Sequence, residues 1–197
     1  MTCFSRPINF PVNPKPNIIL IGMKSSGKTT IGRILARKLG LRFTDVDAEA
    51  ERLHFEKTGE KLGFREIFKA HGKDYFRNLE TAALQAVTVA RNERPFVLAT
   101  GGGLPLAEEN RPLLRGAGII VFLDVAEEVL LPRITALGIP AFFPYPDDPA
   151  RSLAELLAVR RPIYAALAHL TVACHSESQD TIADAIIHRL ENQPHED

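Results

Sequence analysis

Short apolar runs alternate along this chain with longer segments in which apolar residues recur at helical spacing. The first run, Ile18–Ile21, is continuous, which is typical of a strand buried on both faces of a parallel sheet. Four later runs have a similar character, at 41–44, 96–100, 119–123 and 170–174. Helical spacing follows the first run up to Gly40 and returns at 46–57, 64–70, 73–92, 126–137, 152–168 and 179–191. The alternation predicts an α/β fold of three layers, with helices on both faces of a five-stranded parallel sheet.

Three segments depart from this alternation. Residues 1–16 contain four prolines before Asn17, and we expect them to form a disordered tail ahead of a single domain, 17–197. Residues 46–92 form a long helical insertion between the second and third strands. Residues 138–151 contain four prolines and cannot form a regular element, so we expect a lid, because long irregular loops in compact domains are often functional.

Composition narrows the class of protein. The chain has 197 residues, of which 45% are hydrophobic and 24% charged, as is usual for a globular domain. Its formal net charge is zero, so no basic field indicates nucleic acid, and no apolar run is long enough to span a membrane. The two cysteines, Cys3 and Cys174, give neither a disulfide framework nor a zinc site, which favours a reducing compartment. We therefore expect a cytoplasmic protein, and a monomer.

The segment from Gly22 to Thr29 fits the pattern G-x-x-x-x-G-K-[ST] at every fixed position. It lies between the first strand and a helical pattern, which is the context that distinguishes a phosphate-binding loop from a Gly/Ser turn beside a surface lysine. Lys28 would then reach the β- and γ-phosphates of ATP, and the Thr29 hydroxyl would hold Mg²⁺. The expected nucleotide contacts come from Gly22, Lys24, Ser25, Ser26, Gly27, Lys28, Thr29 and Thr30.

Two carboxylates, Asp45 and Asp47, follow the second predicted strand. In an open α/β sheet this strand end lies on the side where ligands bind, beside the phosphate loop. One carboxylate could serve Mg²⁺, and the other could orient or deprotonate an attacking hydroxyl. Helix capping is the alternative interpretation, because aspartate is common at the start of helices. The loop upstream favours the catalytic interpretation.

Further candidates come from three separate parts of the chain. Arg77 is followed three residues later by Glu80, which could hold its guanidinium for a substrate carboxylate. Gly101–Gly103 follow the third strand, where they would expose backbone N–H groups and let a ligand approach closely. Arg160 begins the segment Arg-Arg-Pro-Ile-Tyr after the proline-rich loop. The alternative for Arg77 is a solvated helix face, and for Gly101–Gly103 it is a flexible turn. The alternative for Arg160 and the arginine that follows it is a pair of surface residues.

In combination, and in this order, these motifs resemble those of shikimate kinases, over roughly Asn17 to Leu190. The resemblance implies a nucleoside-monophosphate-kinase-like fold of the P-loop kinase type, with strand order 2-3-1-4-5. It also implies transfer of the ATP γ-phosphate to the 3-hydroxyl of shikimate, with Lys28 and Asp47 as catalytic residues. The implied shikimate contacts are Asp47, Phe68, Phe76, Arg77, Gly101, Gly102, Gly103 and Arg160. Thr29 and Asp45 would serve Mg²⁺, and Arg133 would lie near the adenine.

The chain departs from the family pattern in the lid. Shikimate kinases carry an arginine there, directly before a proline and two apolar residues, whereas the aligned stretch of this chain reads Pro140-Ala141-Phe142-Phe143 and holds no arginine. Lys24, Arg151 and Arg133 could supply the missing charge, and Lys24 is favoured because its reach needs no lid motion. Two other functions stay open: a kinase of another small hydroxy acid, and a catalytically impaired relative that binds nucleotide or a partner.

Overall fold

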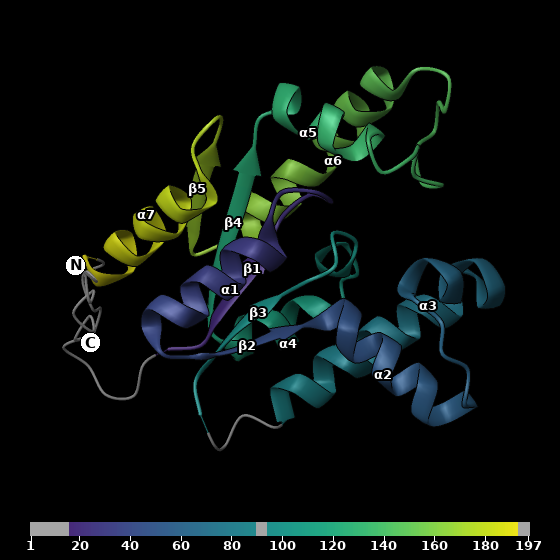
Figure 1. Cartoon of the computed structure of the whole chain (residues 1–197), viewed down its shortest axis with the longest axis horizontal. Coiled ribbons are helices and arrows are strands. Elements are labelled where there is room, and N and C mark those ends of the chain that lie inside the picture. Colours follow the sequence, from purple (N-terminus) through teal and green to yellow (C-terminus); the bar gives the residue numbers. More distant parts are fainter. Residues whose placement is uncertain (1–15, 90–93, 193–197) are drawn as a thin grey trace, which may run out of the picture.

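Five parallel strands form the centre of the molecule (Figure 1). The structure is a computed structural model, and it describes residues 16–89 and 94–192. The strands lie in the order β2-β3-β1-β4-β5, which confirms the order implied by the family resemblance. Their bounds are β1 Ile18–Ile21, β2 Arg42–Asp45, β3 Phe96–Ala99, β4 Ile119–Val125 and β5 Leu170–Cys174.

Helices cover both faces of the sheet, as predicted (Figure 1). Alternate residues of β1 point to opposite faces: Ile18 and Leu20 belong to one buried cluster, and Ile19 and Ile21 to the other. The first cluster includes side chains of α1, α5 and α7, and the second those of α2, α3 and α4. The helices are α1 Lys28–Leu39, α2 Val46–Thr58, α3 Phe64–Val89, α4 Asn110–Ala117, α5 Glu127–Thr135, α6 Pro149–Leu167 and α7 Gln179–Glu191.

The structure corrects several predicted bounds. Helix α4 and a 3₁₀ turn, η2 Leu104–Leu106, occupy a segment where no element was expected. Helix α6 begins at Pro149 rather than at residue 152, because the Asp148 side chain accepts from the Arg151 N–H and caps it. The two helical patterns from 64 to 92 are one run bent at Gly72, which has φ 82° and ψ 175°. The predicted tail, apart from residue 16, and the predicted end of that pattern at 90–92 lie outside the described residues.

The expected lid and insertion stand on either side of the sheet's ligand-binding end (Figure 1). The insertion is formed by α2 and α3, which pack on each other. The proline-rich loop connects α5 to α6; Phe143 buries its ring in the core, and the Tyr145 N–H donates to Ser152 Oγ at 2.9 Å. Among the described helices, none is long and apolar enough to cross a bilayer.

Candidate active site

The loop between β1 and α1 has the backbone that phosphate binding requires. Gly22 has φ +143°, and a Cβ there would lie 2.8 Å from the Leu123 carbonyl oxygen, so a side chain is excluded. Gly27 is also left-handed, with φ 90° and ψ 9°, and directly precedes the N-terminus of α1. Ser25 adopts φ 64°, a left-handed conformation that costs a non-glycine residue roughly 1–2 kcal/mol. The loop therefore has a strained, curved backbone, and the N-terminus of α1, which is the positive end of the helix dipole, faces the position of a ligand.

Lys28 lies buried inside this curve. Its Nζ donates to the carbonyl oxygens of Gly22 at 3.0 Å and Met23 at 2.7 Å, and to Ser26 Oγ at 3.3 Å. Burial lowers the pKa of Lys28 to about 8, while the nearby carboxylates of Asp47 and Asp45 oppose that change. A buried ammonium in this position favours an anionic ligand, because negative charge would offset its desolvation.

Thr29 and Asp45 converge on one point, although they come from α1 and β2. The Thr29 hydroxyl donates to Asp45 Oδ2 at 2.8 Å. The other oxygen, Oδ1, accepts from the Asp47 N–H at 3.0 Å and caps α2. Asp45 therefore caps α2 through Oδ1, which is one of the two interpretations that the sequence left open, while its Oδ2 lies beside the Thr29 hydroxyl. The two hard oxygen donors side by side fit Mg²⁺, which is usually held by one or two protein oxygens and the phosphates of its substrate.

Asp47 stands in the first turn of α2, between the phosphate loop and the end of β3. Burial raises the pKa of Asp47 to about 6; the Asp45 carboxylate adds to the increase and Lys28 opposes it. A Cβ at Gly101 would lie 2.7 Å from Asp47 Oδ1 and 2.8 Å from Glu80 Oε1, so a side chain there would displace these carboxylates. A carboxylate with a raised pKa in a cleft is suited to accept a proton at neutral pH.

Arg77 and Glu80 form an ion pair within α3. Glu80 is 2% exposed, and burial raises its pKa to about 7, against the opposing effect of the Arg77 charge. The Arg77 guanidinium packs directly on Gly103, where any Cβ would collide with it. Glu80 therefore holds the guanidinium against the glycine segment, as the sequence predicted for a carboxylate-binding arginine.

Tyr164 connects the glycine segment to α6. Its hydroxyl donates to the Gly102 carbonyl oxygen at 2.6 Å, and its ring is fully buried. The charges of Arg160 and Arg77 both act to lower the pKa of Tyr164, although burial raises it overall. Arg77 packs on Gly103 and Arg160 lies one turn before Tyr164 and next to Met23, so the two arginines reach the same end of the sheet from α3 and α6. In the sequence Tyr164 stands out only as part of a motif, because its role depends on a contact across 62 positions of the chain.

Arg160 also contacts the phosphate loop and the lid. Its Nη1 lies 3.5 Å from Met23 Sδ, and its guanidinium lies 5.0 Å from the centre of the Phe142 ring. The neighbouring Arg161 has a structural task instead, donating to Asp124 Oδ1 at 2.8 Å and to the Val125 carbonyl at 3.1 Å. The structure thus separates the two adjacent arginines into one that faces the site and one that holds the end of β4.

Lys24 points from the phosphate loop toward the insertion. Its Nζ lies 5.5 Å from the centre of the Phe64 ring, and burial, followed by the Arg65 charge, lowers its pKa, while Asp47 opposes this. Arg65, which no sequence motif marked, reaches the lid base, where its Nη1 lies 3.4 Å from the Leu137 carbonyl oxygen. Two cations therefore stand between the insertion and the lid.

The remaining predicted residues are divided between the site and the surface. Phe68 and Phe76 meet edge to face, with ring centres 5.7 Å apart, and Phe76 is buried. Thr30 and Arg133 are exposed, in the first turn of α1 and the last turn of α5.

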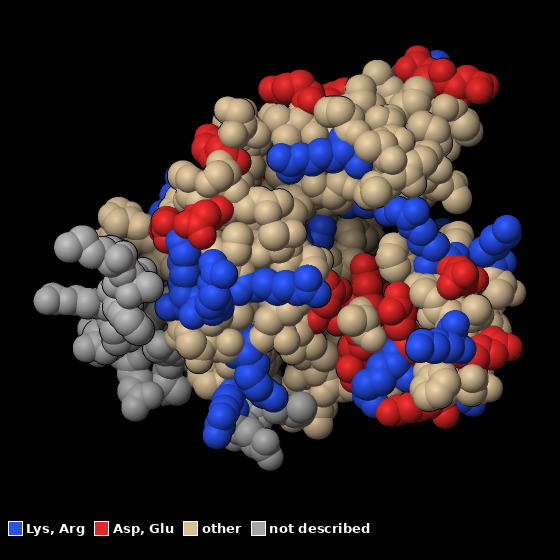
Figure 2. Space-filling model, in the orientation of Figure 1, with Lys and Arg blue, Asp and Glu red and all other residues tan. Residues whose placement is uncertain are grey.

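Figure 2 shows the surface hollowed between the α5–α6 part and the α2–α3 part, with acidic atoms on the α2 side and basic atoms at the rim.

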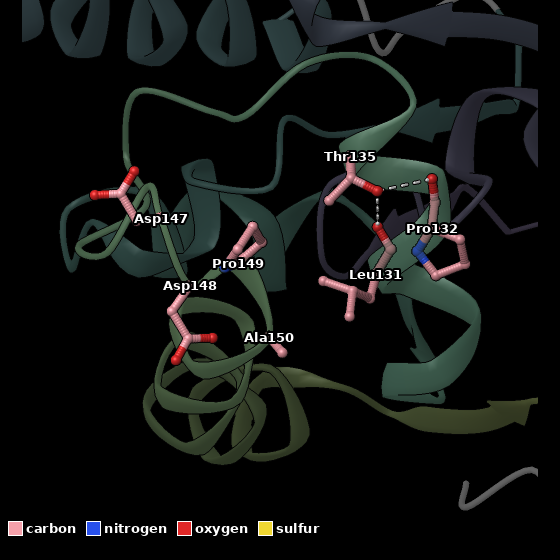
Figure 3. A pocket seen from close by; sticks show the side chains of 7 residues that line it. All are labelled: Leu131, Pro132, Thr135, Asp147, Asp148, Pro149 and Ala150. Carbon is pink, nitrogen blue, oxygen red and sulfur yellow. Dashed lines mark hydrogen bonds between the residues drawn. The ribbon is translucent and has the colours of Figure 1, made fainter.

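A second hollow, of about 420 Å³, lies away from these residues (Figure 3). It is lined by Leu131, Pro132, Thr135, Asp147, Asp148, Pro149 and Ala150, at the junction of α5 with the start of α6. The Thr135 hydroxyl is already bonded to the carbonyl oxygens of Leu131 and Pro132, at 3.0 and 3.3 Å. None of the predicted site residues lines this hollow, and we assign it no role in the chemistry.

The fold and this arrangement define the class of protein: a P-loop kinase that carries two arginines near its phosphate loop and glycine segment. Comparison with known proteins gives the family. The family model described as shikimate kinase matches residues 24–191. The chain is 38% identical to "Shikimate kinase" of Synechococcus sp. (strain CC9605) over 88% of this chain and 82% of that protein. It is 35% identical to "Shikimate kinase" of Symbiobacterium thermophilum over 90% of this chain and 97% of that protein.

Solved structures agree with the sequence comparisons. Shikimate kinase from Acinetobacter baumannii in complex with shikimate matches with a TM-score of 0.79 and 35% identity, covering 90% of this chain and 93% of that one. Shikimate kinase from Aquifex aeolicus matches with a TM-score of 0.69 and 32% identity, over 89% of this chain and 96% of that one. The chain belongs to the shikimate kinase family.

Proposed function

We propose that this protein transfers the γ-phosphate of ATP to the 3-hydroxyl of shikimate. The observation that carries the proposal is the meeting of three groups at one end of the sheet. These are a phosphate loop with a buried lysine, a carboxylate with a raised pKa, and two arginines that approach the glycine segment. The first group suits ATP, the second a hydroxyl, and the third the carboxylate of a small acid.

In this proposal each residue has a distinct task. Lys28 leaves its carbonyl partners for the β- and γ-phosphates, and the loop N–H groups orient the triphosphate. Mg²⁺, held by Thr29 and Asp45, would neutralise phosphate charge. Asp47 accepts the proton of the attacking hydroxyl, for which its raised pKa is suited. Arg77 and Arg160 hold the substrate carboxylate, so that the hydroxyl at the other side of the ring faces Asp47.

The pocket walls support a small cyclic acid. Phe68 and Phe76 offer an apolar surface beside Arg77, whose guanidinium lies 6.0 Å from the Phe76 ring centre. Gly101 and Gly103, which carry no side chain, let the side chains of Asp47, Glu80 and Arg77 approach the backbone at the other side closely. A protein of this kind, with ATP as its phosphate donor, would act in the cytoplasm as a monomer without nucleic acid or membrane.

The lid gives one reason to keep a second function open. The lid stretch Pro140–Phe143 holds no arginine and so supplies no charge here. Arg151 is engaged on the outside, where its guanidinium lies 3.9 Å from the Tyr145 ring centre and its Nε donates to Glu155 at 3.1 Å. Lys24, close to Asp47, is the better candidate for the missing cation. If no residue supplies it, the chain is a nucleotide-binding relative with impaired turnover.

Substrate-dependent ATP hydrolysis or transfer tests the proposal. A coupled assay of ADP release should show turnover with shikimate and much weaker turnover with shikimate methyl ester, which lacks the carboxylate charge. Equal turnover with both compounds would show that the two arginines do not recognise the substrate through its carboxylate. Turnover with a different hydroxy acid alone would retain the kinase chemistry and replace shikimate as the substrate.

A further inference from the structure

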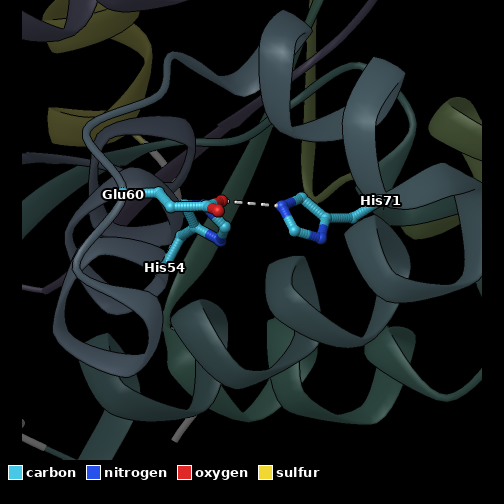
Figure 4. Close-up of side chains that lie close together, drawn as sticks. All are labelled: His54, Glu60 and His71. Carbon is cyan, nitrogen blue, oxygen red and sulfur yellow. Dashed lines mark hydrogen bonds and ion pairs between the residues drawn. The ribbon is translucent and has the colours of Figure 1, made fainter.

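Two histidines and a glutamate meet in the insertion, outside the site described above (Figure 4). His54 lies near the end of α2, Glu60 in the connection from α2 to α3, and His71 in α3, directly before the bend at Gly72. The Nε2 atoms of His54 and His71 lie 3.4 and 3.1 Å from the same Glu60 oxygen, Oε2. We propose that these three residues bind a Zn²⁺ ion.

Two of the three donor separations match a tetrahedral zinc site. Zinc bonds to histidine nitrogen and carboxylate oxygen are about 2.0–2.2 Å, which places neighbouring tetrahedral donors roughly 3.3 Å apart. The two nitrogen–oxygen separations, 3.4 and 3.1 Å, lie on either side of that value, and all three donor atoms lie within 4.8 Å of one another. The imidazole rings are inclined by 64° with centres 4.9 Å apart, so they converge without stacking. An ion could therefore enter with little rearrangement.

The surroundings orient the ligands. His54 is fully buried, and its Nδ1 lies 2.9 Å from the Tyr75 hydroxyl. Its Nε2 is left for the other side, where Glu60 Oε2 and Thr58 Oγ1 both lie at 3.4 Å. Metal-ligating histidines are usually fixed in this way through their second nitrogen. The side chains of His71 and Glu60 are 29% and 52% exposed, which gives an ion a route in and leaves a fourth position for water. Two imidazoles and one carboxylate are donors typical of zinc, whereas Mg²⁺ and Ca²⁺ prefer oxygen alone.

The site would add a link between two helices, α2 and α3, that already pack on each other. A bound ion would tie the end of α2 to the first arm of α3, which carries Phe68 of the expected substrate pocket. The cysteine count excluded only thiolate sites, so it does not argue against this one. The competing interpretation is a metal-free triad, in which each imidazole donates to Glu60. Lys57 is the neighbouring cation, with its Nζ 5.3 Å from the Tyr75 ring centre. Its positive charge is more compatible with the metal-free triad than with a bound Zn²⁺ ion.

Equilibrium dialysis against zinc chloride, without nucleotide and followed by elemental analysis, tests the proposal on the full chain. We expect about one Zn²⁺ per chain, and tetrahedral visible absorption when Co²⁺ replaces it. His71→Ala and Glu60→Gln should each weaken zinc binding at least about hundredfold, since even outer partners of a ligand contribute about 10–100-fold. His188→Ala removes an exposed imidazole from α7 and is the matched control; it should bind zinc as the wild type does.

Two further measurements distinguish zinc binding at this triad from zinc binding elsewhere on the chain. Zinc should raise the melting temperature of the wild type and of His188→Ala, a chelator should reverse the increase, and His71→Ala should show no increase. Tyr75→Phe should weaken zinc binding about 10–100-fold while the protein stays folded. Equal zinc binding by the wild type and His71→Ala would overturn the proposal, as would zinc binding that Asp45→Asn abolishes, because the ion would then lie at the phosphate loop.

Discussion

Replacing Asp47 by asparagine should reduce turnover while leaving the fold at least as stable. Asparagine keeps the size of the side chain but cannot accept the hydroxyl proton. General-base catalysis contributes typically 10²–10⁴-fold, so we expect kcat to fall by about that factor. The KM for ATP should change little, because Lys28 and the loop backbone hold the phosphates.

The stability effect has the opposite sign and follows from the pKa of Asp47. Burial raises that pKa from 3.8 to about 6, so the folded state binds more protons than the unfolded state between these pH values. Stability therefore decreases as pH rises through this window, and above it the ionised carboxylate opposes folding by up to about 3 kcal/mol. The amide of asparagine carries no charge, so Asp47→Asn should lose this penalty. At pH 7.5 the melting temperature of the variant should equal or exceed that of the wild type, whereas at pH 4 the difference should be smaller.

Steady-state kinetics and thermal unfolding at both pH values provide the assay. Asp74→Asn makes the same chemical change at an exposed position of α3 and is the control; neither kcat nor melting temperature should move. A variant with near-normal kcat would show that Asp47 is only a first-turn residue of α2. A variant that melts well below the wild type at pH 7.5 would refute the desolvation argument, since loss of activity would then reflect a damaged fold.

Three further changes test the rest of the site. Lys28→Ala should abolish ATP binding measured by calorimetry, because no other buried cation was found in the described part of the phosphate loop; unchanged tight binding would remove Lys28 from the site. Arg77→Lys and Arg160→Lys should raise the KM for shikimate, since lysine cannot form the bidentate pair; if both variants match the wild type, carboxylate recognition lies elsewhere. Lys24→Ala should lower kcat and kcat/KM together by at least about tenfold, or roughly 1.4 kcal/mol, whereas Arg151→Ala should lower neither. The reverse result would show that Arg151, in the lid, supplies the missing positive charge.

Local sequence signals predicted the phosphate loop and the sheet correctly because they depend on neighbouring residues. The run Ile18–Ile21, the glycines after it and the helical spacing that follows are all contained within about 20 positions. Helix α4 was missed for a local reason too. It has only eight residues, with Pro112 near its start and Gly116 near its end, and both residues weaken a helical pattern.

Long-range contacts explain what the sequence alone could not supply. Tyr164 reaches Gly102 only because α6 packs on η2, which follows β3, and Arg65 approaches the lid only because α3 stands opposite it. His54 and His71 are 17 positions apart and become neighbours when α2 and α3 pack on each other. Asp45 shows a different limit: the sequence offered capping and metal binding as alternatives, and the structure places both oxygens of one carboxylate so that it can do both.

Phosphorus NMR of the reaction mixture tests the central proposal most directly. The full chain is incubated with Mg²⁺, ATP and shikimate, and the products are followed over time. The proposal predicts a new phosphate monoester on the 3-hydroxyl of shikimate, formed in equal amount with ADP and absent when shikimate is omitted. Formation of ADP and free phosphate without that ester, or no consumption of ATP beyond the shikimate-free control, would contradict it.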